Sequence, residues 1–370
     1  MVLKQIELQN FRLHKNTSLN FSDNLNLIVG GNGHGKTSIL EAIYYLCTTK
    51  NLNLANENDV IMFGEQYFEA KGSFYDLTTN QTRIFYDTLK NKKNYFLDDK
   101  QIFRSSSVIG KFPIVSLIQS DHAITQGSPA ERRRFVDSVI SQSSNTYLEI
   151  LLEFNKTLRQ RSSLLSQIKE SRSVNLFGQL DAWTEAIILS GTEIIKHRIS
   201  FVKEFNSHLK DAYNHIVDVS EEPQIIYNPF PELNDGNIAD RFRQELELLR
   251  EDELRRGTNL VGPHRDEFTF FINGLELRRF GSQGQHKTFQ IALRFGQFFF
   301  MKEKLGKTPI FLMDDIFGEL DSNRAGKISA HLSEIGQAFI TMTDLTKTES
   351  LNINTENILI KVNNGKAAYA

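Results

Sequence analysis

A glycine-rich loop between an apolar run and a helical pattern limits the folds open to this chain more than any other feature. Residues 30–37 read GGNGHGKT and match the pattern GxxxxGK(S/T) in full. The run LNLIVG precedes the loop, and helical spacing follows from Thr37 to about Cys47. In such a strand, loop and helix, backbone N–H groups converge on phosphate oxygens and the helix N-terminus favours an anion. The pattern predicts a nucleotide-binding α/β fold.

The loop also predicts how a nucleotide is held. We expect Lys36 to reach the β and γ phosphates and Thr37 to bind Mg²⁺. The plainer alternative is a glycine-rich turn whose lysine is only solvated. The predicted nucleotide-binding residues of the loop are Gly30, Gly31, Asn32, Gly33, His34, Gly35, Lys36, Thr37 and Ser38.

A second anchor for the metal is predicted near the other end of the chain. The apolar segment PIFLMDD ends in Asp314 and Asp315, and phosphate-loop enzymes hold Mg²⁺ with an Asp of this kind. We expect Asp314 to hold Mg²⁺ and Asp315 to orient or deprotonate the attacking water. An N-cap role at the next helix is the alternative. Because most of the chain separates Lys36 from Asp314, a large second lobe is inserted between the two motifs.

Length and pattern together predict two lobes. At 370 residues the chain exceeds the roughly 250 to 300 at which a single core stops growing. Lobe I is predicted to combine residues 1–117 with 309–370, and lobe II to span 118–308. Lobe II reads as mainly helical from about 128 to 254, without the sustained heptads of a long coiled coil.

Lobe I is expected to hold more than the nucleotide-binding unit. Alternating segments between Tyr67 and Phe103 predict an antiparallel meander. Apolar runs at 25–30, 309–315 and 337–344 predict strands. The last residues, NNGKAAYA, are expected to form a frayed tail.

Composition restricts the cellular setting. A net charge of −2 argues against a surface that is basic all round, so a polyanion must meet a local basic face. The lone Cys47 excludes an internal disulfide framework and suits a reducing cytosol. The first residues alternate apolar and polar, unlike a signal peptide, and no apolar run approaches the roughly 20 residues of a membrane helix. We expect a cytoplasmic protein that does not enter a membrane.

A second motif comes before the apolar strand. SQGQHKT at 282–288 resembles the signature of ABC-type ATPases, and GELD at 318–321 is similar to their D-loop. In that superfamily the signature of one subunit caps the γ-phosphate held by the other, again through a helix N-terminus offered to an anion. A polar turn that only caps a helix is the alternative for Ser282.

Seven segments together resemble the RecF family of bacterial recombination mediators. They are NFRLHKN, GGNGHGKTSILEAIYYL, GSPAERRRFVD, LRQRSSLL, LVGPHRDEFTFFING, GSQGQHKTFQIALRF and FLMDDIFGELDSNR, and they span nearly the whole chain. The resemblance implies an ABC/SMC-type ATPase head with ATP and Mg²⁺ as cofactors. It also implies an ATP-dependent homodimer that binds gapped or junction DNA without sequence preference. RecO and RecR are the implied partners, and recombinase loading the implied task.

The resemblance also implies roles for single residues. Lys36 and Asp315 would be catalytic, with Asp314 and Thr37 at the metal. Gln119, after the strand FPIVSLI, falls where a Q-loop glutamine could sense Mg²⁺, although RecF sequences more often have Pro-Glu-Asp there. The remaining matches are Ser282, Gly284 and Gln285 in the signature, Asp321 in the D-loop, Arg12 beside the nucleotide and Thr343 at the switch position.

The predicted activity is a weak, DNA-stimulated ATPase. Most ABC enzymes have Glu at the base position, and the shorter Asp315 implies slow hydrolysis. A nucleotide-binding scaffold with incidental hydrolysis and DNA contact is the competing hypothesis, and a transporter cassette is disfavoured because the chain is too long. The candidate DNA-contacting residues are Lys90, Lys92, Lys93, Arg132, Arg133, Arg134, Arg159, Arg161, Arg278 and Arg279. A solvated surface is the usual role of any one such cluster.

Overall fold

The computed structural model describes most of the chain and divides it into two compact units. The described residues are 1–53, 56–171, 174–217, 221–231, 237–319, 322–332, 334–344 and 356–370. Unit 1 consists of Met1–Asp121, Asp211–Ser220 and Gln290–Ala370, and unit 2 of His122–Lys210 and Glu221–Phe289.

The boundary between the units falls inside a helix. The predicted lobe I resumed at residue 309, whereas unit 1 resumes at Gln290, within α10 (Gln283–Leu305). Phe295 and Phe298 of this helix are buried and lie 5.1 and 5.9 Å, centroid to centroid, from Phe311 in the following strand. Aromatic packing therefore assigns most of α10 to unit 1.

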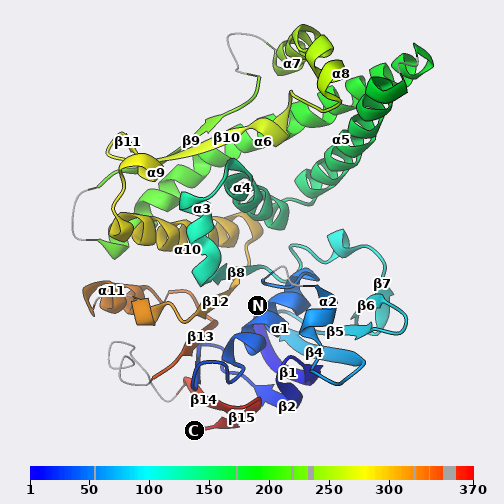
Figure 1. The fold of residues 1–370 in the computed structure, drawn as a ribbon. Helices are drawn as coiled ribbons and strands as arrows, with labels where there is room; N and C mark the ends of the chain where they lie inside the picture. Colours follow the sequence, from blue (N-terminus) through cyan, green and yellow to red (C-terminus); the bar gives the residue numbers. More distant parts are fainter. Residues whose placement is uncertain are drawn as a thin grey trace. The chain divides into compact units, whose positions relative to one another are not determined.

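A six-stranded sheet forms the centre of unit 1 (Figure 1). Its order is β15-β14-β3-β13-β12-β8, and every neighbouring pair except β14–β15 is parallel. The strands are β3 (Leu25–Val29), β8 (Ile114–Leu117), β12 (Ile310–Asp314), β13 (Ala338–Met342), β14 (Ile358–Asn363) and β15 (Lys366–Tyr369). Since parallel strands end at the same edge, the segments after β3, β8 and β12 lie close together there.

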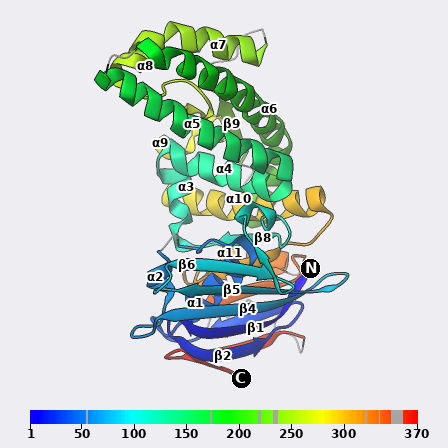
Figure 2. The same ribbon diagram turned by 90° about the vertical axis from the view of Figure 1, so that its right-hand side faces the viewer.

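The predicted meander forms part of a second sheet in unit 1, whose strands lie across the view in Figure 2. Its order is β2-β1-β4-β5-β6-β7. The strands are β1 (Val2–Phe11), β2 (His14–Asn20), β4 (Tyr67–Tyr75), β5 (Thr79–Asp87), β6 (Lys92–Leu97) and β7 (Lys100–Ile102). Helix α1 (Lys36–Thr48) shares one core with both sheets, in which its Ile39 and Ile43 cluster with Ile28 of β3 and Phe68 of β4. The short α2 (Glu57–Val60) and α11 (Ser322–Leu332) complete the regular elements named here.

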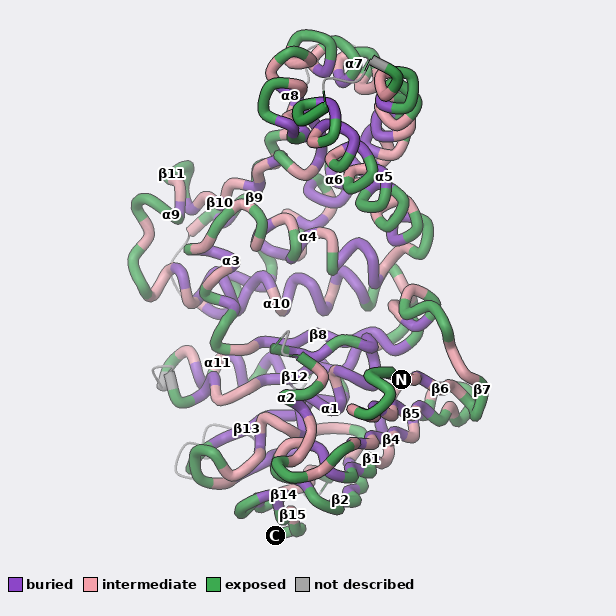
Figure 3. Tube along the Cα trace, turned by 45° about the vertical axis from the view of Figure 1, so that its right-hand side comes forward, coloured by how far each residue is buried: buried purple, intermediate pink, exposed green. Residues whose placement is uncertain are grey.

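Unit 2 is mainly helical. Its helices are α3 (His122–Gln126), α4 (Pro129–Ser143), α5 (Asn145–Ser171), most of α6 (Phe177–Ile216), α7 (Ile238–Leu248), α8 (Arg250–Arg256) and α9 (Leu277–Phe280). Buried and exposed residues alternate along these helices (Figure 3), as expected for amphipathic helices with one face toward the core. Among the described residues, α6 is the longest helix at 40 residues, so the structure contains no long coiled coil. None of the described helices combines the length and apolarity needed to cross a bilayer.

Two strand assignments differ from the sequence predictions. The interval 128–254 was predicted to be helical, but β9 (Pro223–Asn228) lies within it and pairs with β10 (Glu267–Ile272), which also pairs with β11 (Leu275–Glu276). The frayed tail predicted at the end is also wrong, since β14 and β15 form a hairpin. Its turn residues Asn364 and Gly365 both have positive φ, at 46° and 74°. Asn-Gly is the sequence signal for such a two-residue turn, and this signal was missed.

A buried ion-pair network holds unit 2 together. The Arg198 side chain, 2% exposed, donates to Asp266 at 2.7 Å and to Asp137 at 2.9 Å. Tyr227 and the backbone N–H of Phe230 also donate to Asp266. Burial raises the pKa of Asp266, while Arg198 acts in the opposite direction. The network joins α4, α6 and the β10 region through one arginine.

Arg198→Met is expected to lower the free energy of unfolding of unit 2 by about 3–5 kcal/mol, because it leaves buried carboxylates without their cation. The single Trp183 lies in unit 2, so its fluorescence in a urea titration reports this unfolding. Arg243→Met breaks only exposed pairs, those with Glu185 and Asp240, and should change the midpoint little. Equal midpoint shifts for the two variants would contradict this account.

Candidate nucleotide-binding site

The glycine-rich loop leaves the parallel sheet at its carboxyl edge. It follows β3, and the Gly30 N–H donates to the Met342 carbonyl of β13 at 3.2 Å. A Cβ on Gly30 would lie 2.2 Å from the Val362 carbonyl oxygen of β14, so only glycine fits this close approach. Helix α1 begins at Lys36, and the residue before it, Gly35, has a φ of 104°. The first N–H groups of α1 have no carbonyl partner within the helix and can therefore meet an anion.

Lys36 is held inside the loop that precedes it. Its Nζ donates to the carbonyls of Gly30 at 2.8 Å and Gly31 at 3.0 Å, and the residue is 6% exposed. The ammonium group therefore lies against the loop, the position from which a lysine meets phosphate oxygens.

Thr37 and Asp314 meet although 277 positions separate them. The Thr37 hydroxyl lies 2.9 and 3.1 Å from the two carboxylate oxygens of Asp314. The buried Thr341 of β13 donates from its hydroxyl to Asp314 at 2.7 Å, and the same oxygen accepts the Asp315 N–H at 2.9 Å. Asp315 has a φ of 52°, a left-handed conformation that Asp tolerates better than most residues. The first turn of α1 and the ends of β12 and β13 thus fix the Asp314 carboxylate and the backbone of Asp315.

A cavity of about 380 Å³ opens at this edge of the sheet. Gln119 reaches it because the turn Gln119–Asp121 follows β8, the neighbour of β12. The Asp121 carboxylate in this turn is held by Arg294 of α10 at 2.6 Å. The cavity is lined by Leu13, Asn32, Gly33, Gly35, Lys36, Thr37, Ser38, Gln119, Asp314 and Asp315. The structure thus brings the predicted loop, both carboxylates and Gln119 around one space.

The donor set at this cavity fits a hard divalent cation. A hydroxyl, a carboxylate and an amide are oxygen ligands of the kind that Mg²⁺ prefers. Among the described residues, no group of three or more His, Cys, Asp or Glu side chains could hold a metal ion. Mg²⁺ bound through one or two carboxylates and the phosphates of a substrate needs no such group.

Arg12, which was predicted to lie beside the nucleotide, does not line the cavity. Its guanidinium forms a bidentate ion pair with Glu41 of α1, at 2.8 and 3.1 Å, and also donates to the Asp59 carbonyl. Glu41 is buried and accepts a further bond from Asn53. Leu13, the next residue, lines the cavity instead. Gly30, Gly31 and His34 also lie outside the lining.

The signature segment lies in unit 2 and caps its own helix. The Ser282 hydroxyl accepts the Gln285 N–H at 3.2 Å, and the Gln285 side chain accepts the Ser282 N–H at 2.9 Å. This reciprocal pair is a capping box at the start of α10, with Gly284 in its first turn. The capping role proposed as the alternative for Ser282 is therefore present. Asp321, predicted for the D-loop, lies outside the described residues.

Two of the candidate DNA-contacting arginines prove to be structural. Arg132 is 4% exposed and pairs with Glu267 at 2.8 Å, and Arg161 is 3% exposed and pairs with Glu253 at 2.6 Å. The prediction that these two side chains meet DNA is wrong, because a buried, paired guanidinium is not available to phosphate. The candidates with exposed side chains are Lys90, Lys92, Arg134, Arg159, Arg278 and Arg279.

The sequence did not reveal the roles of Thr341, at the site, and of Glu41, the partner of Arg12. The sequence pointed to Thr343, which directly follows β13, whereas the contacts to both aspartates come from Thr341, within the strand. A polar residue in the apolar strand AFITM was the available signal. Nothing local distinguishes Glu41, whose partner Arg12 lies 29 residues away.

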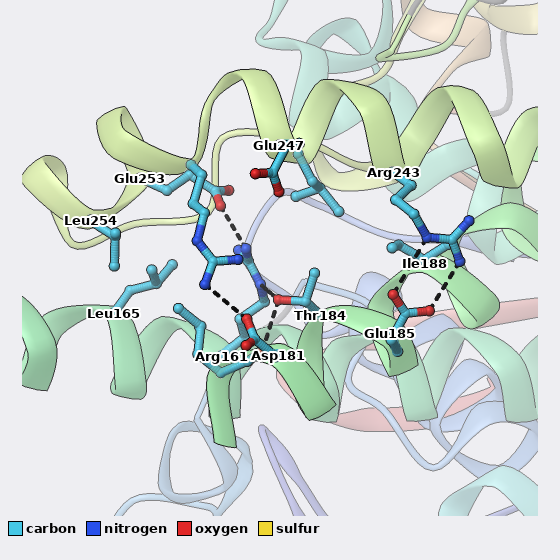
Figure 4. A pocket seen from close by; sticks show the side chains of 13 residues that line it. Arg161, Leu165, Asp181, Thr184, Glu185, Ile188, Arg243, Glu247, Glu253 and Leu254 are labelled. Atoms are coloured by element: carbon cyan, nitrogen blue, oxygen red, sulfur yellow. Dashed lines mark hydrogen bonds and ion pairs between the residues drawn. The ribbon is translucent and has the colours of Figure 1, made fainter. Parts of the chain in front are cut away.

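A second cavity, of about 260 Å³, lies in unit 2 among α5, α6, α7 and α8 (Figure 4). Its three arginines are paired with carboxylates of the same unit: Arg161 with Glu253, Arg243 with Glu185 and Arg250 with Asp181. Because these charges satisfy one another, this cavity does not offer the convergent donors of the first one.

Comparison with known proteins identifies the family. A family model described as RecF/RecN/SMC N terminal domain matches residues 2–366. A Chloroherpeton thalassium protein named DNA replication and repair protein RecF is 39% identical over 353 residues, which cover 93% of this chain and 95% of the relative. The chain belongs to the RecF family. A Salinibacter ruber RecF is 34% identical over 350 residues, covering 93% of this chain and 85% of the relative.

Solved structures agree with the family assignment. This RecF-family chain is similar to a structure described as the recombination mediator protein RecF-ATP in the RecFOR pathway, with a TM-score of 0.89 and 28% identity. The match covers 100% of this chain and 97% of that one. The Smc head domain of Pyrococcus furiosus has a TM-score of 0.58 at 14% identity, with 100% and 95% coverage, which is a likeness of fold alone. The prediction of an ABC/SMC-head fold without a long coiled coil is confirmed.

Proposed function

We propose that this chain is an ATP-dependent DNA-binding clamp of recombinational gap repair. It binds ATP with Mg²⁺ at the glycine-rich loop, dimerises on ATP and holds gapped or junction DNA in the cytoplasm. It hydrolyses ATP slowly, with stimulation by DNA, and helps partners of the RecR and RecO type to load recombinase. The observation that carries the proposal is the contact of Thr37 with Asp314 beside Lys36, because this set of groups suits a metal-bound triphosphate.

ATP is the nucleotide that the comparisons favour. A RecF of known structure is described as the ATP complex, and a second as RecF-ATPrS. In this chain Lys36 and the first turn of α1 would bind the phosphates, together with the backbone from Gly30 to Gly35 and with Ser38. Thr37 and Asp314 would hold Mg²⁺, and Gln119 would contact the metal or its water. A bound Mg²⁺ would neutralise charge on the phosphate oxygens.

Asp315 is the proposed general base. It lines the same cavity as Lys36, and the Thr341 hydroxyl accepts its backbone N–H, which fixes the main chain from which the carboxylate extends. A carboxylate in this place can orient the attacking water and accept its proton. A Glu side chain would extend one methylene further toward the water. Because Asp315 is shorter, we expect it to support only slow turnover of ATP.

A second copy of the chain is proposed to complete the site. The start of α10 offers a helix N-terminus with Ser282, Gly284 and Gln285, a second place suited to an anion. In the proposed dimer this segment caps the γ-phosphate held by the other copy, with Asp321 at the interface and Arg12 rearranged toward the nucleotide. ATP then joins the two copies, and ADP does not.

DNA is proposed to bind an exposed basic surface through its phosphates. Arg134, Arg159, Arg278 and Arg279 are exposed in unit 2, and Lys90 and Lys92 in unit 1. A dimer carries two sets of these groups, so a chain of charge −2 can still neutralise several phosphates. Binding of this kind is independent of sequence and weakens steeply with salt.

The solution mass is expected to double with ATP and Mg²⁺ but not with ADP, as measured by light scattering on a sizing column. Lys36→Ala should stay monomeric because it loses the phosphate contact. Ser282→Arg should also stay monomeric, since it alters the signature offered to the other copy. Ser163→Arg adds the same charge to an exposed position of α5 and should dimerise normally. A mass that never changes with nucleotide would contradict the shared site.

Asp315→Asn is expected to bind ATP and dimerise but to lower single-turnover hydrolysis by roughly a hundredfold or more, the usual contribution of a general base. Lys36→Ala is the comparison variant that loses binding itself. The competing function, a scaffold for which hydrolysis is incidental, predicts that Asp315→Asn supports DNA binding and partner assembly through ATP cycles as the wild type does. Unchanged hydrolysis in Asp315→Asn would overturn the assignment of the base.

A further inference from the structure

Three turns from distant parts of the chain meet behind the glycine-rich loop. The first is the turn between β1 and β2, at Arg12 and Leu13. The second is the Asn364–Gly365 turn between β14 and β15. The third is the loop itself. Their contacts involve backbone groups of the loop that face away from the cavity.

Two consecutive carbonyls of the loop are held from this side. The Gly365 N–H donates to the His34 carbonyl at 2.9 Å, and the His14 Nε2–H donates to the Gly35 carbonyl at 2.9 Å. His14 is completely buried, and burial lowers the pKa of its imidazole, so the ring is neutral at pH 7. With Nε2 as the donor, Nδ1 accepts from the Thr17 hydroxyl at 3.0 Å. This second contact fixes the ring that holds Gly35.

The C-terminal hairpin is fastened tightly enough to serve as a support. The Tyr369 hydroxyl accepts the Asn20 N–H at 2.6 Å and lies 3.2 Å from the Asn20 carbonyl, which joins β15 to β2. A Cβ on Gly365 would lie 1.9 Å from the Leu13 carbonyl oxygen. The turn therefore fits between the β1–β2 turn and the loop with no space for a side chain.

The orientation of these carbonyls matters for an anion on the other side of the loop. Each peptide plane carries its N–H opposite its C=O, so the plane that turns the Gly35 carbonyl outward turns the Lys36 N–H inward. The His34 carbonyl fixes the Gly35 N–H in the same way. A loop that binds phosphate through its backbone needs these N–H groups to converge. The contacts from behind restrain the rotation of both peptide planes, and that of Gly35 is restrained in addition because its carbonyl is the first acceptor of α1.

We propose that His14 and the Asn364–Gly365 turn form a rear brace that keeps the loop in its phosphate-binding conformation. The last hairpin of the chain is thereby a part of the nucleotide site although it does not line the cavity. His14 and Gly365 are positioning residues that act through Gly35 and His34. The proposal rests on the proposed function, since it requires that phosphate binds this loop.

Gly365→Ala is expected to weaken ATP binding about tenfold, the effect of losing one hydrogen bond to a charged phosphate. The matched control is Gly274→Ala in the Asn273–Gly274 turn between β10 and β11. That turn also has two positive φ angles, at 51° and 76°, but a Cβ on Gly274 would meet nothing within 4 Å. Both variants carry the same backbone strain, and only Gly365→Ala displaces the brace.

The measurement is competition against a fluorescent nucleotide, with dissociation constants for AMP and ATP. The brace acts on the β and γ phosphates, so Gly365→Ala should reduce the ratio of the AMP constant to the ATP constant. General damage to the fold would weaken the binding of both nucleotides alike and leave the ratio unchanged. Gly274→Ala should keep the wild-type ratio.

Substitutions at His14 give an independent test if Gly365→Ala folds poorly. His14→Leu removes the donor to the Gly35 carbonyl and should reduce the same ratio, whereas His14→Gln retains an N–H and should restore most of it. Equal ratios for His14→Leu, His14→Gln and the wild type would overturn the brace. The proposed function would still stand if the wild type binds ATP and Lys36→Ala does not. A wild type that binds no ATP would overturn both proposals.

Discussion

The contact between Thr37 and Asp314 is the one on which the rest of unit 1 depends. It joins the first turn of α1 to the end of β12 through two residues 277 positions apart, and Thr341 of the intervening β13 completes it. The contact exists only when early and late segments of the chain share one parallel sheet. Unit 2, which is inserted between those segments, leaves this sheet intact because loop closure costs little more for a long insertion than for a short one.

The parts of the fold that were predictable have local signals. The loop pattern, the apolar run before Asp314 and the alternation from Tyr67 to Phe103 each specify their own element, and the structure contains all three. The hairpin of β14 and β15 was also signalled, by Asn364–Gly365, but the polar residues around the turn suggested a tail. Strand β9 is short and lies among long helices, so its pairing with β10 was not evident from its own residues.

The role of charged residues was less predictable, because it depends on distant partners. Arg132 and Arg161 look like surface charges in sequence, yet their carboxylate partners lie 135 and 92 residues away and bury them. Arg12 is likewise paired with Glu41 of α1, which is buried, although 26% of the Arg12 side chain stays exposed. Buried ion pairs of this kind are costly to break, which restricts DNA contact to the exposed clusters and requires Arg12 to exchange partners before it can approach a nucleotide.

The central claim is that Asp314 holds the Mg²⁺ of a bound nucleotide at this loop. Calorimetric titration of ATP, with Mg²⁺ and with EDTA, tests it most directly in the wild type and in Asp314→Asn. The account predicts that Mg²⁺ tightens ATP binding to the wild type, and that Asp314→Asn loses roughly 10- to 100-fold of this gain, as expected for a group that orients a metal. An equal gain from Mg²⁺ in both proteins would contradict the account.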